Sequence, residues 1–283
     1  MSASIIDGKE MAKQTRIQLK KEITKLLEAG KKAPGLTVIL VGEDPASQIY
    51  VRNKEKFAKR VGIVSDVIRL PKETKQEELL ELIQSLNENN DVHGILVQMP
   101  LPKHMDEAEV LRTIDEKKDV DGFHVMNAGK LFIGQEALEA CTPKGIIKLI
   151  ESTGVPIEGK HAVVVGRSNI VGKPVAMMLL SRNATVTMCH SRTKDLAGMV
   201  KQADIVVAAV GRANLITKDM VKDGAIVIDV GMNRVDEKLY GDVEFEGVKE
   251  VASHITPVPG GVGPMTISML LSNTLEAYKR YGQ

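Results

Sequence analysis

The sequence has no tryptophan, and its 283 residues include only four phenylalanines, four tyrosines and two cysteines. Two cysteines are too few for a disulfide framework or a structural zinc site, so we expect packed thiols at Cys141 and Cys189 and no metal. The 38 basic and 37 acidic residues nearly cancel, which argues against nucleic-acid or membrane-surface partners. The chain also lacks an apolar run of about 20 residues and a signal-peptide core. We therefore expect a cytoplasmic protein that acts on small molecules.

Short β-branched runs alternate with helical patterns along the chain, which predicts the α/β class with parallel sheets. The length and the 43% apolar content fit two domains. In the first half, helices are expected near residues 8–29, 46–61 and 74–89, and strands near 36–41, 64–70 and 95–98. Thr74 and Glu77 have the spacing of a capping box at the start of the third helix.

An irregular segment rich in Gly and Lys, residues 119–145, marks the boundary between the domains. After it, a helix from Pro143 leads to strands near 162–165, 185–189, 205–210 and 225–230, and a last helix near 265–281. This pattern predicts a small α/β catalytic domain, residues 1–140 joined by the C-terminal helix 265–283, and a doubly wound Rossmann-type domain, residues 141–264. We expect a cleft between the two domains.

A glycine turn follows the first strand of the second domain. It begins at Gly166 and runs to Gly172, where a helix starts, so backbone N–H groups could meet a pyrophosphate. The turn departs from the usual G-x-G-x-x-G spacing because Ser168 replaces the middle glycine. The next strand ends in His190-Ser191-Arg192-Thr193, without the acid that binds the ribose of NAD. Arg167, Ser191 and Arg192 offer donors for a 2′-phosphate instead, so we predict NADP, although a plain turn with solvated arginines would give the same pattern.

Three residues share one face of the helix predicted over 46–61. Ser47, Tyr50 and Lys54 recur at i, i+3 and i+7. A partly desolvated lysine has a lowered pKa and can act as a general base, while a nearby tyrosine can stack on a ring. Because Lys56 and Lys59 lie close by, an ordinary solvated face is the alternative.

Three further segments carry polar or glycine-rich signals. Gln98 ends a buried strand, where its amide could hold a lysine ammonium or simply bond to backbone. Asp121 precedes Gly122, so its carboxylate could bind an amidine-like edge such as that of a pterin, or the pair could form only a turn. The run from Pro259 to Thr266 combines three glycines with two prolines and could approach a flat ligand closely.

Together these segments resemble the bifunctional methylenetetrahydrofolate dehydrogenase/cyclohydrolase family over essentially the whole chain. The resemblance rests on five segments in order: Tyr50-Val51-x-x-Lys54, Gly94 to Pro102, Asp119 to Gly122, Gly166-Arg167-Ser168-x-x-Val171-Gly172-x-Pro174, and Pro259 to Thr266. It implies oxidation of 5,10-methylenetetrahydrofolate with NADP, followed by hydrolysis of the methenyl product to 10-formyltetrahydrofolate. It also implies a homodimer formed through the cofactor domain and a role in purine, methionine and histidine biosynthesis.

The resemblance further implies roles for individual residues. The catalytic and substrate-binding residues implied are Lys54, Tyr50, Gln98 and Asp121, with Ser47, Gly263 and Pro264 bordering the folate. The cofactor-binding residues implied are Gly166, Arg167, Ser168, Ser191 and Met232. Met232 stands where isoleucine is common in the family, a change that keeps an apolar contact.

Three alternatives stay open from the sequence. The first is a monofunctional methylenetetrahydrofolate dehydrogenase, which could use NAD. The second is a two-domain NADP dehydrogenase of the shikimate dehydrogenase type, and the third is a ligand sensor without catalysis.

Overall fold

The computed structural model describes residues 2–282 and divides the chain into two compact units. Unit 1 contains the residues up to 12 together with 142–266, and unit 2 contains 13–141 together with the residues from 267 onward. Two helices, α1 (Gly8–Glu28) and α10 (Val262–Tyr281), contribute residues to both units. Among residues 2–282, no helix combines the length and apolar composition needed to cross a membrane.

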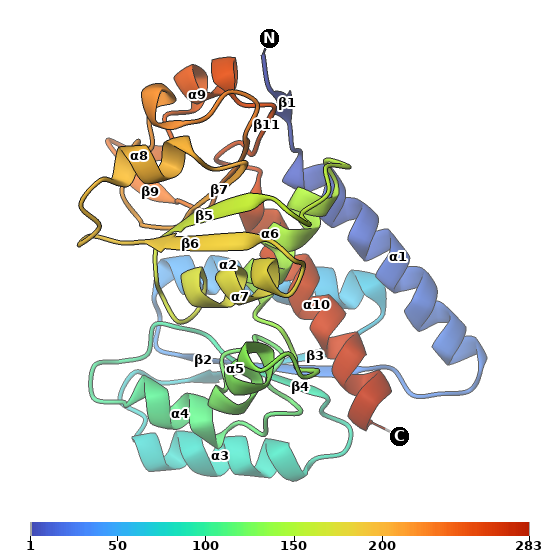
Figure 1. The fold of residues 1–283 in the computed structure, drawn as a ribbon. Coiled ribbons are helices and arrows are strands. Elements are labelled where there is room, and N and C mark those ends of the chain that lie inside the picture. The colour runs from blue at the N-terminus through green and yellow to red at the C-terminus, as the bar shows by residue number, and fades with distance from the viewer. Residues whose placement is uncertain (1, 283) are drawn as a thin grey trace. The chain divides into compact units, whose positions relative to one another are not determined.

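Unit 2 is built on a three-stranded parallel sheet. Its strands are β2 (Gly35–Val41), β3 (Val64–Leu70) and β4 (Gly94–Val97), in the order β3-β2-β4. Every residue of the central strand β2 is buried, because helices cover both faces of the sheet. Helix α2 (Pro45–Val61) lies on one face, and α3 (Gln76–Glu88) and α4 (Glu107–Thr113) lie on the other (Figure 1).

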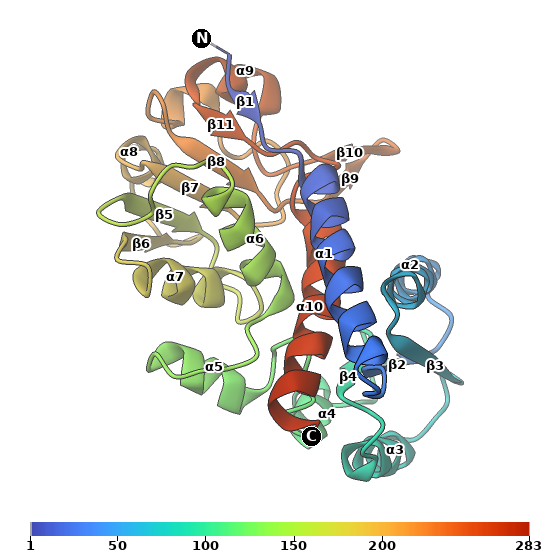
Figure 2. The same ribbon diagram turned by 90° about the vertical axis from the view of Figure 1, so that its right-hand side faces the viewer.

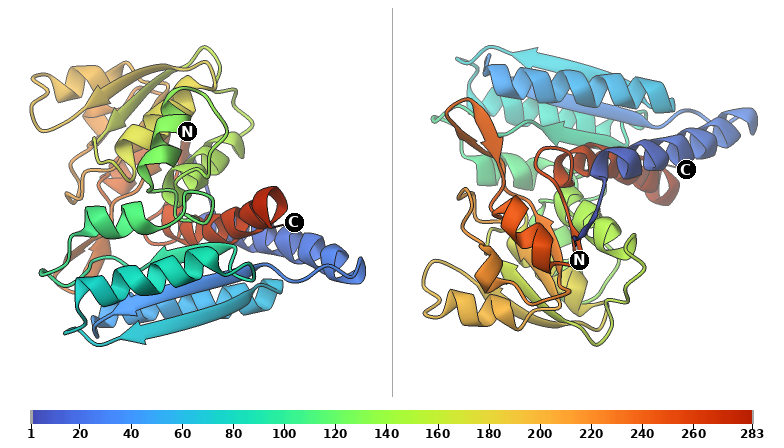
Figure 3. Two further views of the ribbon diagram at one scale, coloured as in Figure 1. Left: turned by 90° about the horizontal axis from the view of Figure 1, so that it is seen from below. Right: turned by 90° about the horizontal axis from the view of Figure 1, so that it is seen from above.

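Two long helical segments complete unit 2. The parts of α1 and α10 that belong to this unit lie side by side (Figure 3). Lys279 donates a hydrogen bond to Glu22 at 2.6 Å, and Arg16 donates one to the Ser268 hydroxyl at 2.8 Å. After α4, unit 2 also contains α5 (Val125–Phe132) and Cys141, the first residue of α6 (Cys141–Glu151).

Unit 1 contains a six-stranded parallel sheet in the order β1-β11-β8-β7-β5-β6 (Figure 2). The strands are β1 (Ser4–Ile5), β5 (His161–Val165), β6 (Thr185–Cys189), β7 (Ile205–Ala208), β8 (Ile226–Asp229) and β11 (His254–Ile255). The chain runs from β5 to β6 on one side and then returns to β7 on the other. The direction of strand addition therefore reverses at β5, which creates the switch point at which doubly wound sheets bind ligands.

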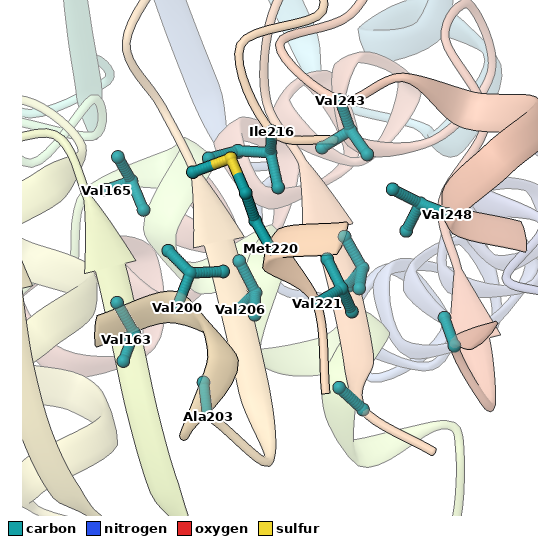
Figure 4. Packing of buried hydrophobic residues seen from close by; sticks show 14 of the residues in the cluster. Val163, Val165, Val200, Ala203, Val206, Ile216, Met220, Val221, Val243 and Val248 are labelled. Carbon is teal, nitrogen blue, oxygen red and sulfur yellow. The ribbon is translucent and has the colours of Figure 1, made fainter. Parts of the chain in front are cut away.

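Helices cover both faces of this sheet as well. Helix α7 (Gly172–Leu180) packs against β5 and β6. On the opposite face, α8 (Leu196–Lys201), the 3-10 helix η1 (Lys218–Met220) and α9 (Phe245–Val251) enclose a core of small aliphatic residues. Val200, Met220 and Val248 from these helices pack over the valines of the sheet (Figure 4). An antiparallel hairpin, β9 (Asn233–Val235) and β10 (Lys238–Tyr240), follows β8.

Three details differ from the sequence predictions. The capping box at Thr74 and Glu77 is wrong, because α3 begins at Gln76 and its N-cap, Lys75, makes no side-chain capping bond. The segment 119–145 is not wholly irregular, since it contains α5. Helix α10 begins at Val262, before the predicted start, because a proline is well accommodated in a first helical turn, where N–H groups have no intrahelical acceptor.

The first residues of the chain also lie elsewhere than expected. The sequence placed residues 1–140 in one domain, whereas the structure groups the residues up to 12 with unit 1. The reason is that β1 pairs with β11 and that Ala3 is buried in the core of unit 1.

Candidate active site

Helix α2 carries the first three predicted site residues of unit 2. Asp44 caps the helix by accepting a hydrogen bond from the Ser47 backbone N–H at 2.7 Å, so the start of α2 is fixed. Ser47 is buried in the first turn, and Tyr50, one turn later, is 41% exposed. Lys54 lies a further turn along the same face and is partly buried.

The Lys54 ammonium meets Gln98, which follows β4 at the carboxyl edge of the sheet. Lys54 Nζ donates a hydrogen bond to Gln98 Oε1 at 2.9 Å. The Gln98 amide nitrogen donates to the Met99 carbonyl oxygen at 2.7 Å, and its backbone N–H donates to the Ile39 carbonyl at 2.8 Å. The first bond orients the side-chain amide so that its carbonyl oxygen faces the lysine, and the second fixes the backbone that carries it.

Asp121 and Lys54 influence each other's ionisation. Burial lowers the pKa of Lys54, while the nearby acidic groups of Asp121 and Cys141 act in the opposite direction. Burial likewise raises the pKa of Asp121, and the Lys54 ammonium opposes that change. A lysine with a lowered pKa gives up its proton more readily, so it can accept a proton as well as donate one.

Asp119 organises the loop that carries Asp121. Its side chain is buried, and its carboxylate accepts four hydrogen bonds. The donors are the backbone N–H groups of Gly122 (3.1 Å), Phe123 (3.2 Å) and His124 (2.8 Å) and the side-chain amide of Asn127 (3.0 Å). The sequence analysis selected Asp121 because it precedes Gly122, but it gave no role to Asp119, which holds the loop.

Asn273 and Cys141 are two further residues at this site that sequence reasoning did not select for it. Asn273, on α10, donates to the carbonyl oxygens of Val120 at 2.9 Å and Glu139 at 2.8 Å. The Cys141 thiol donates to the Val120 carbonyl at 3.1 Å, and the Cys141 N–H donates to the Asp121 carbonyl at 3.2 Å. Because cysteine is rare in this chain, we expected packed thiols, and Cys141 is buried. Its place beside Asp121 depends on contacts that the sequence does not reveal.

In unit 1 the glycine turn opens directly from β5. Gly166 has φ +127°, and a Cβ atom there would lie 2.1 Å from the Ala209 carbonyl oxygen, so only glycine fits. The Ser168 hydroxyl accepts hydrogen bonds from the N–H groups of Val171 at 3.2 Å and Gly172 at 3.3 Å, where α7 begins. Arg167 and Ser168 are exposed at the start of this turn.

The end of β6 adjoins this turn. Val165 pairs with Cys189, so the segments that follow β5 and β6 leave the sheet at the same edge. The exposed side chains there are Arg167, Ser191 and Arg192. The exposed hydroxyl and guanidinium donors and the close-packed glycine turn fit the phosphates of a dinucleotide, including a 2′-phosphate. Met232 is 55% exposed just after β8.

Two predicted substrate residues belong to unit 1 rather than to the unit that carries Lys54. Gly263 and Pro264 occupy the first turn of α10, and Gly263 is exposed. Their contribution to the folate site therefore stays a prediction.

Comparison with known proteins shows to which family this two-unit chain belongs. Residues 6–121 match the model of the tetrahydrofolate dehydrogenase/cyclohydrolase catalytic domain, and residues 140–282 match that of the family's NAD(P)-binding domain. The chain belongs to the tetrahydrofolate dehydrogenase/cyclohydrolase family. This membership confirms the predicted family, the two-domain α/β fold with a Rossmann-type half, and the enzyme class.

Individual members of the family resemble the chain over its full length. It is 62% identical over 277 residues to the bifunctional protein FolD of Exiguobacterium sibiricum, covering 98% of this chain and 100% of that protein. The crystal structure of the bifunctional FolD enzyme of Campylobacter jejuni matches with a TM-score of 0.96 at 48% identity, covering 98% and 99% of the two chains. The Trypanosoma brucei FolD structure, complexed with NADP cofactor and inhibitor, matches with a TM-score of 0.95 at 41% identity, covering 99% and 98%. The family model of residues 140–282 confirms that this unit is an NAD(P)-binding domain.

Proposed function

We propose that this chain oxidises 5,10-methylenetetrahydrofolate with NADP and then hydrolyses 5,10-methenyltetrahydrofolate to 10-formyltetrahydrofolate. Within a chain of this family, the observation that carries the proposal is the pairing of Lys54 with Gln98 and Asp121 at the carboxyl edge of a parallel sheet. A dehydrogenase needs mainly positioning, whereas ring opening by water needs a group that moves protons. Lys54 is that group.

The residues of unit 2 bind and orient the folate. Asp121 presents a carboxylate that accepts two parallel hydrogen bonds from the amide and exocyclic amine of the pterin. Tyr50, 41% exposed on α2, stacks on the folate ring. Ser47 and Gln98 complete the substrate-facing surface, and Gln98 also holds Lys54 through its bond of 2.9 Å.

Lys54 moves the protons of the hydrolysis. In its neutral form the Nζ atom takes a proton from water as the water oxygen bonds to the methenyl carbon. The ammonium so formed returns a proton to N5 of the folate as the bond between that carbon and N5 breaks. The remaining hydroxyl proton is lost to solvent as the formyl group forms on N10, so the reaction consumes one water and releases one proton.

The residues of unit 1 hold the cofactor. Gly166, Arg167 and Ser168 bind its phosphates beside the start of α7, and Ser191 and Arg167 face the 2′-phosphate. Met232 covers the nicotinamide end with an apolar side chain. When bound, NADP supplies the acceptor for the hydride of the methylene group.

Three finer predictions belong to the same proposal. Gly263 and Pro264 border the pterin pocket, the chain forms a homodimer through its cofactor-binding unit, and the enzyme works in the cytoplasm, where it supplies one-carbon units for purine, methionine and histidine biosynthesis. Sedimentation of the purified protein tests the dimer, and fractionation of cells tests the location.

Two optical measurements on one preparation test the proposed function. With methylenetetrahydrofolate and NADP we expect NADPH absorbance to rise, and with methenyltetrahydrofolate alone we expect the methenyl absorbance to decay faster than in buffer. Accumulation of the methenyl product without enzymatic decay would indicate a monofunctional dehydrogenase. Absence of both signals would refute the proposal.

A further inference from the structure

Asp242 is a buried carboxylate in unit 1 that the proposed chemistry does not use. It follows the β9–β10 hairpin, its side chain is fully buried, and four N–H groups point at its two oxygens. Oδ2 accepts from the backbone of Val210 at 2.6 Å and Gly211 at 3.0 Å, and Oδ1 accepts from the backbone of Arg212 at 2.9 Å and the side chain of Asn233 at 2.9 Å. One buried side chain is therefore the common acceptor of all four donors.

The donors come from two different loops at the carboxyl edge of the sheet. Residues 210–212 follow β7, and Asn233 lies just after Met232 in the segment that follows β8. Gly231, in the second segment, has no room for a side chain, because a Cβ atom there would lie 2.4 Å from Asp242 Oδ1. One carboxylate therefore joins both loops.

A second buried carboxylate fixes Asp242 itself. Asp229, at the end of β8, accepts hydrogen bonds from the backbone N–H groups of Asp242 at 2.8 Å, Gly231 at 2.9 Å and Val243 at 3.0 Å. The backbone of Asp242 is thus anchored to the sheet, and its side chain has little freedom to follow a loop that moves.

The first loop borders the glycine turn that we assign to the cofactor phosphates. Ala209 bonds to Val165 through its N–H at 2.8 Å, and its carbonyl oxygen is the atom that leaves no room for a side chain at Gly166. Three successive backbone N–H groups converging on an anion form a nest, an arrangement that elsewhere binds phosphate. Here the side chain of Asp242 already fills the nest, so the protein itself supplies the acceptor for this loop, and the phosphates are left to the turn after β5.

We propose that Asp242 is a positioning residue for the cofactor, which holds the loops after β7 and β8 in the one arrangement that receives NADP. The inference rests on the proposed function, because that proposal places NADP at this edge and Met232 at its nicotinamide end. It assigns no contact between Asp242 and the cofactor.

The variant Asp242→Asn tests this role, with Asp204→Asn as its matched control. An amide replaces one of the two oxygens with an NH2 group, so two of the four donors lose their acceptor and face a donor instead. Asp204 is a carboxylate of the same unit that also accepts from a backbone N–H, that of His161 at 3.0 Å, but it lies at the amino end of β7, the opposite edge of the sheet. Its substitution changes charge and backbone bonding without touching the two loops.

The readouts are the dissociation constant of NADP, the Michaelis constants of the dehydrogenase reaction, and the decay of methenyltetrahydrofolate without NADP. We expect Asp242→Asn to raise the NADP dissociation constant about tenfold or more, to raise KM for NADP and not KM for folate, and to leave cofactor-free hydrolysis within about twofold of wild type. We expect Asp204→Asn to change none of these by more than about twofold. An unchanged NADP dissociation constant in folded Asp242→Asn would overturn the inference, and so would an equal fall of both activities, which a purely structural role would give.

A milder variant keeps the inference testable if Asp242→Asn does not fold. Asn233→Ala removes only the bond between the second loop and the carboxylate, and we expect it to raise the NADP dissociation constant about threefold. An unchanged constant in that variant would overturn the inference as well. Because NADP binding is measured without turnover, inactivity of the wild type would refute the proposed function alone.

Discussion

Replacement of Lys54 by methionine should nearly abolish methenyl hydrolysis while leaving part of the hydride transfer. The substitution preserves length and helix propensity on α2 but removes the group to which we assign the proton transfers. It also takes away the donor that Gln98 Oε1 accepts at 2.9 Å and the cation that faces Asp121. General acid–base groups contribute about 10²–10⁴-fold, which corresponds to roughly 3 to 5 kcal/mol of barrier.

A second substitution at the same position separates proton transfer from charge. Lys54→Arg keeps a cation beside Asp121, but arginine is not deprotonated in proteins, so it should also lose most of the hydrolysis. Lys56→Met is the matched control, since Lys56 is exposed on the same helix. The decay of methenyltetrahydrofolate and the formation of NADPH are measured separately for each protein. Hydrolysis by Lys54→Met within about tenfold of wild type, or about 1.4 kcal/mol, would refute the catalytic assignment.

Three more expected outcomes follow from the two units. Arg167→Ala should raise KM for NADP more than KM for NAD by about 1.5 to 3 kcal/mol, the value of a charged hydrogen bond, and equal losses with both cofactors would contradict its contact with the 2′-phosphate. Asp121→Asn should lower both activities together and leave NADP affinity unchanged, whereas normal folate binding with reduced thermal stability would mean that Asp121 only shapes a turn. Burial raises the pKa of Asp229 from 3.8 to about 6, so the folded state holds that proton more tightly than the unfolded chain does. Its contribution to the free energy of unfolding is present in full below pH 4 and is lost as the pH rises through 6, a change of about 3 kcal/mol. An asparagine does not titrate, so this change should be missing from the pH dependence of urea unfolding in Asp229→Asn. Identical pH dependence in the two proteins would contradict this.

The elements that sequence patterns predict well are those whose signal is local and long. The helix predicted over 46–61 and the strand predicted over 64–70 correspond to α2 and β3 within a residue. The patterns missed β1 and β11, which have two residues each and exist only because they pair with one another and with β8. A strand of two residues has no periodicity to detect. It is stabilised by pairing with a strand that is distant in the sequence, since Ser4 of β1 pairs with His254 of β11, more than 200 residues later.

The same limit explains why some site residues could be selected from the sequence and others could not. Tyr50 and Lys54 are found because helical spacing is a local property, and Gln98 because it ends a buried strand. Asn273 bonds to a carbonyl 153 positions away, and Asp242 takes its backbone donors from residues 30 to 32 positions earlier. A polar residue that binds mainly backbone atoms of distant loops leaves no pattern in the sequence, so its role becomes visible only when the fold brings the loops together. The residues that we assign to ligand binding are therefore the ones that local patterns can select, whereas those that join distant loops need the structure.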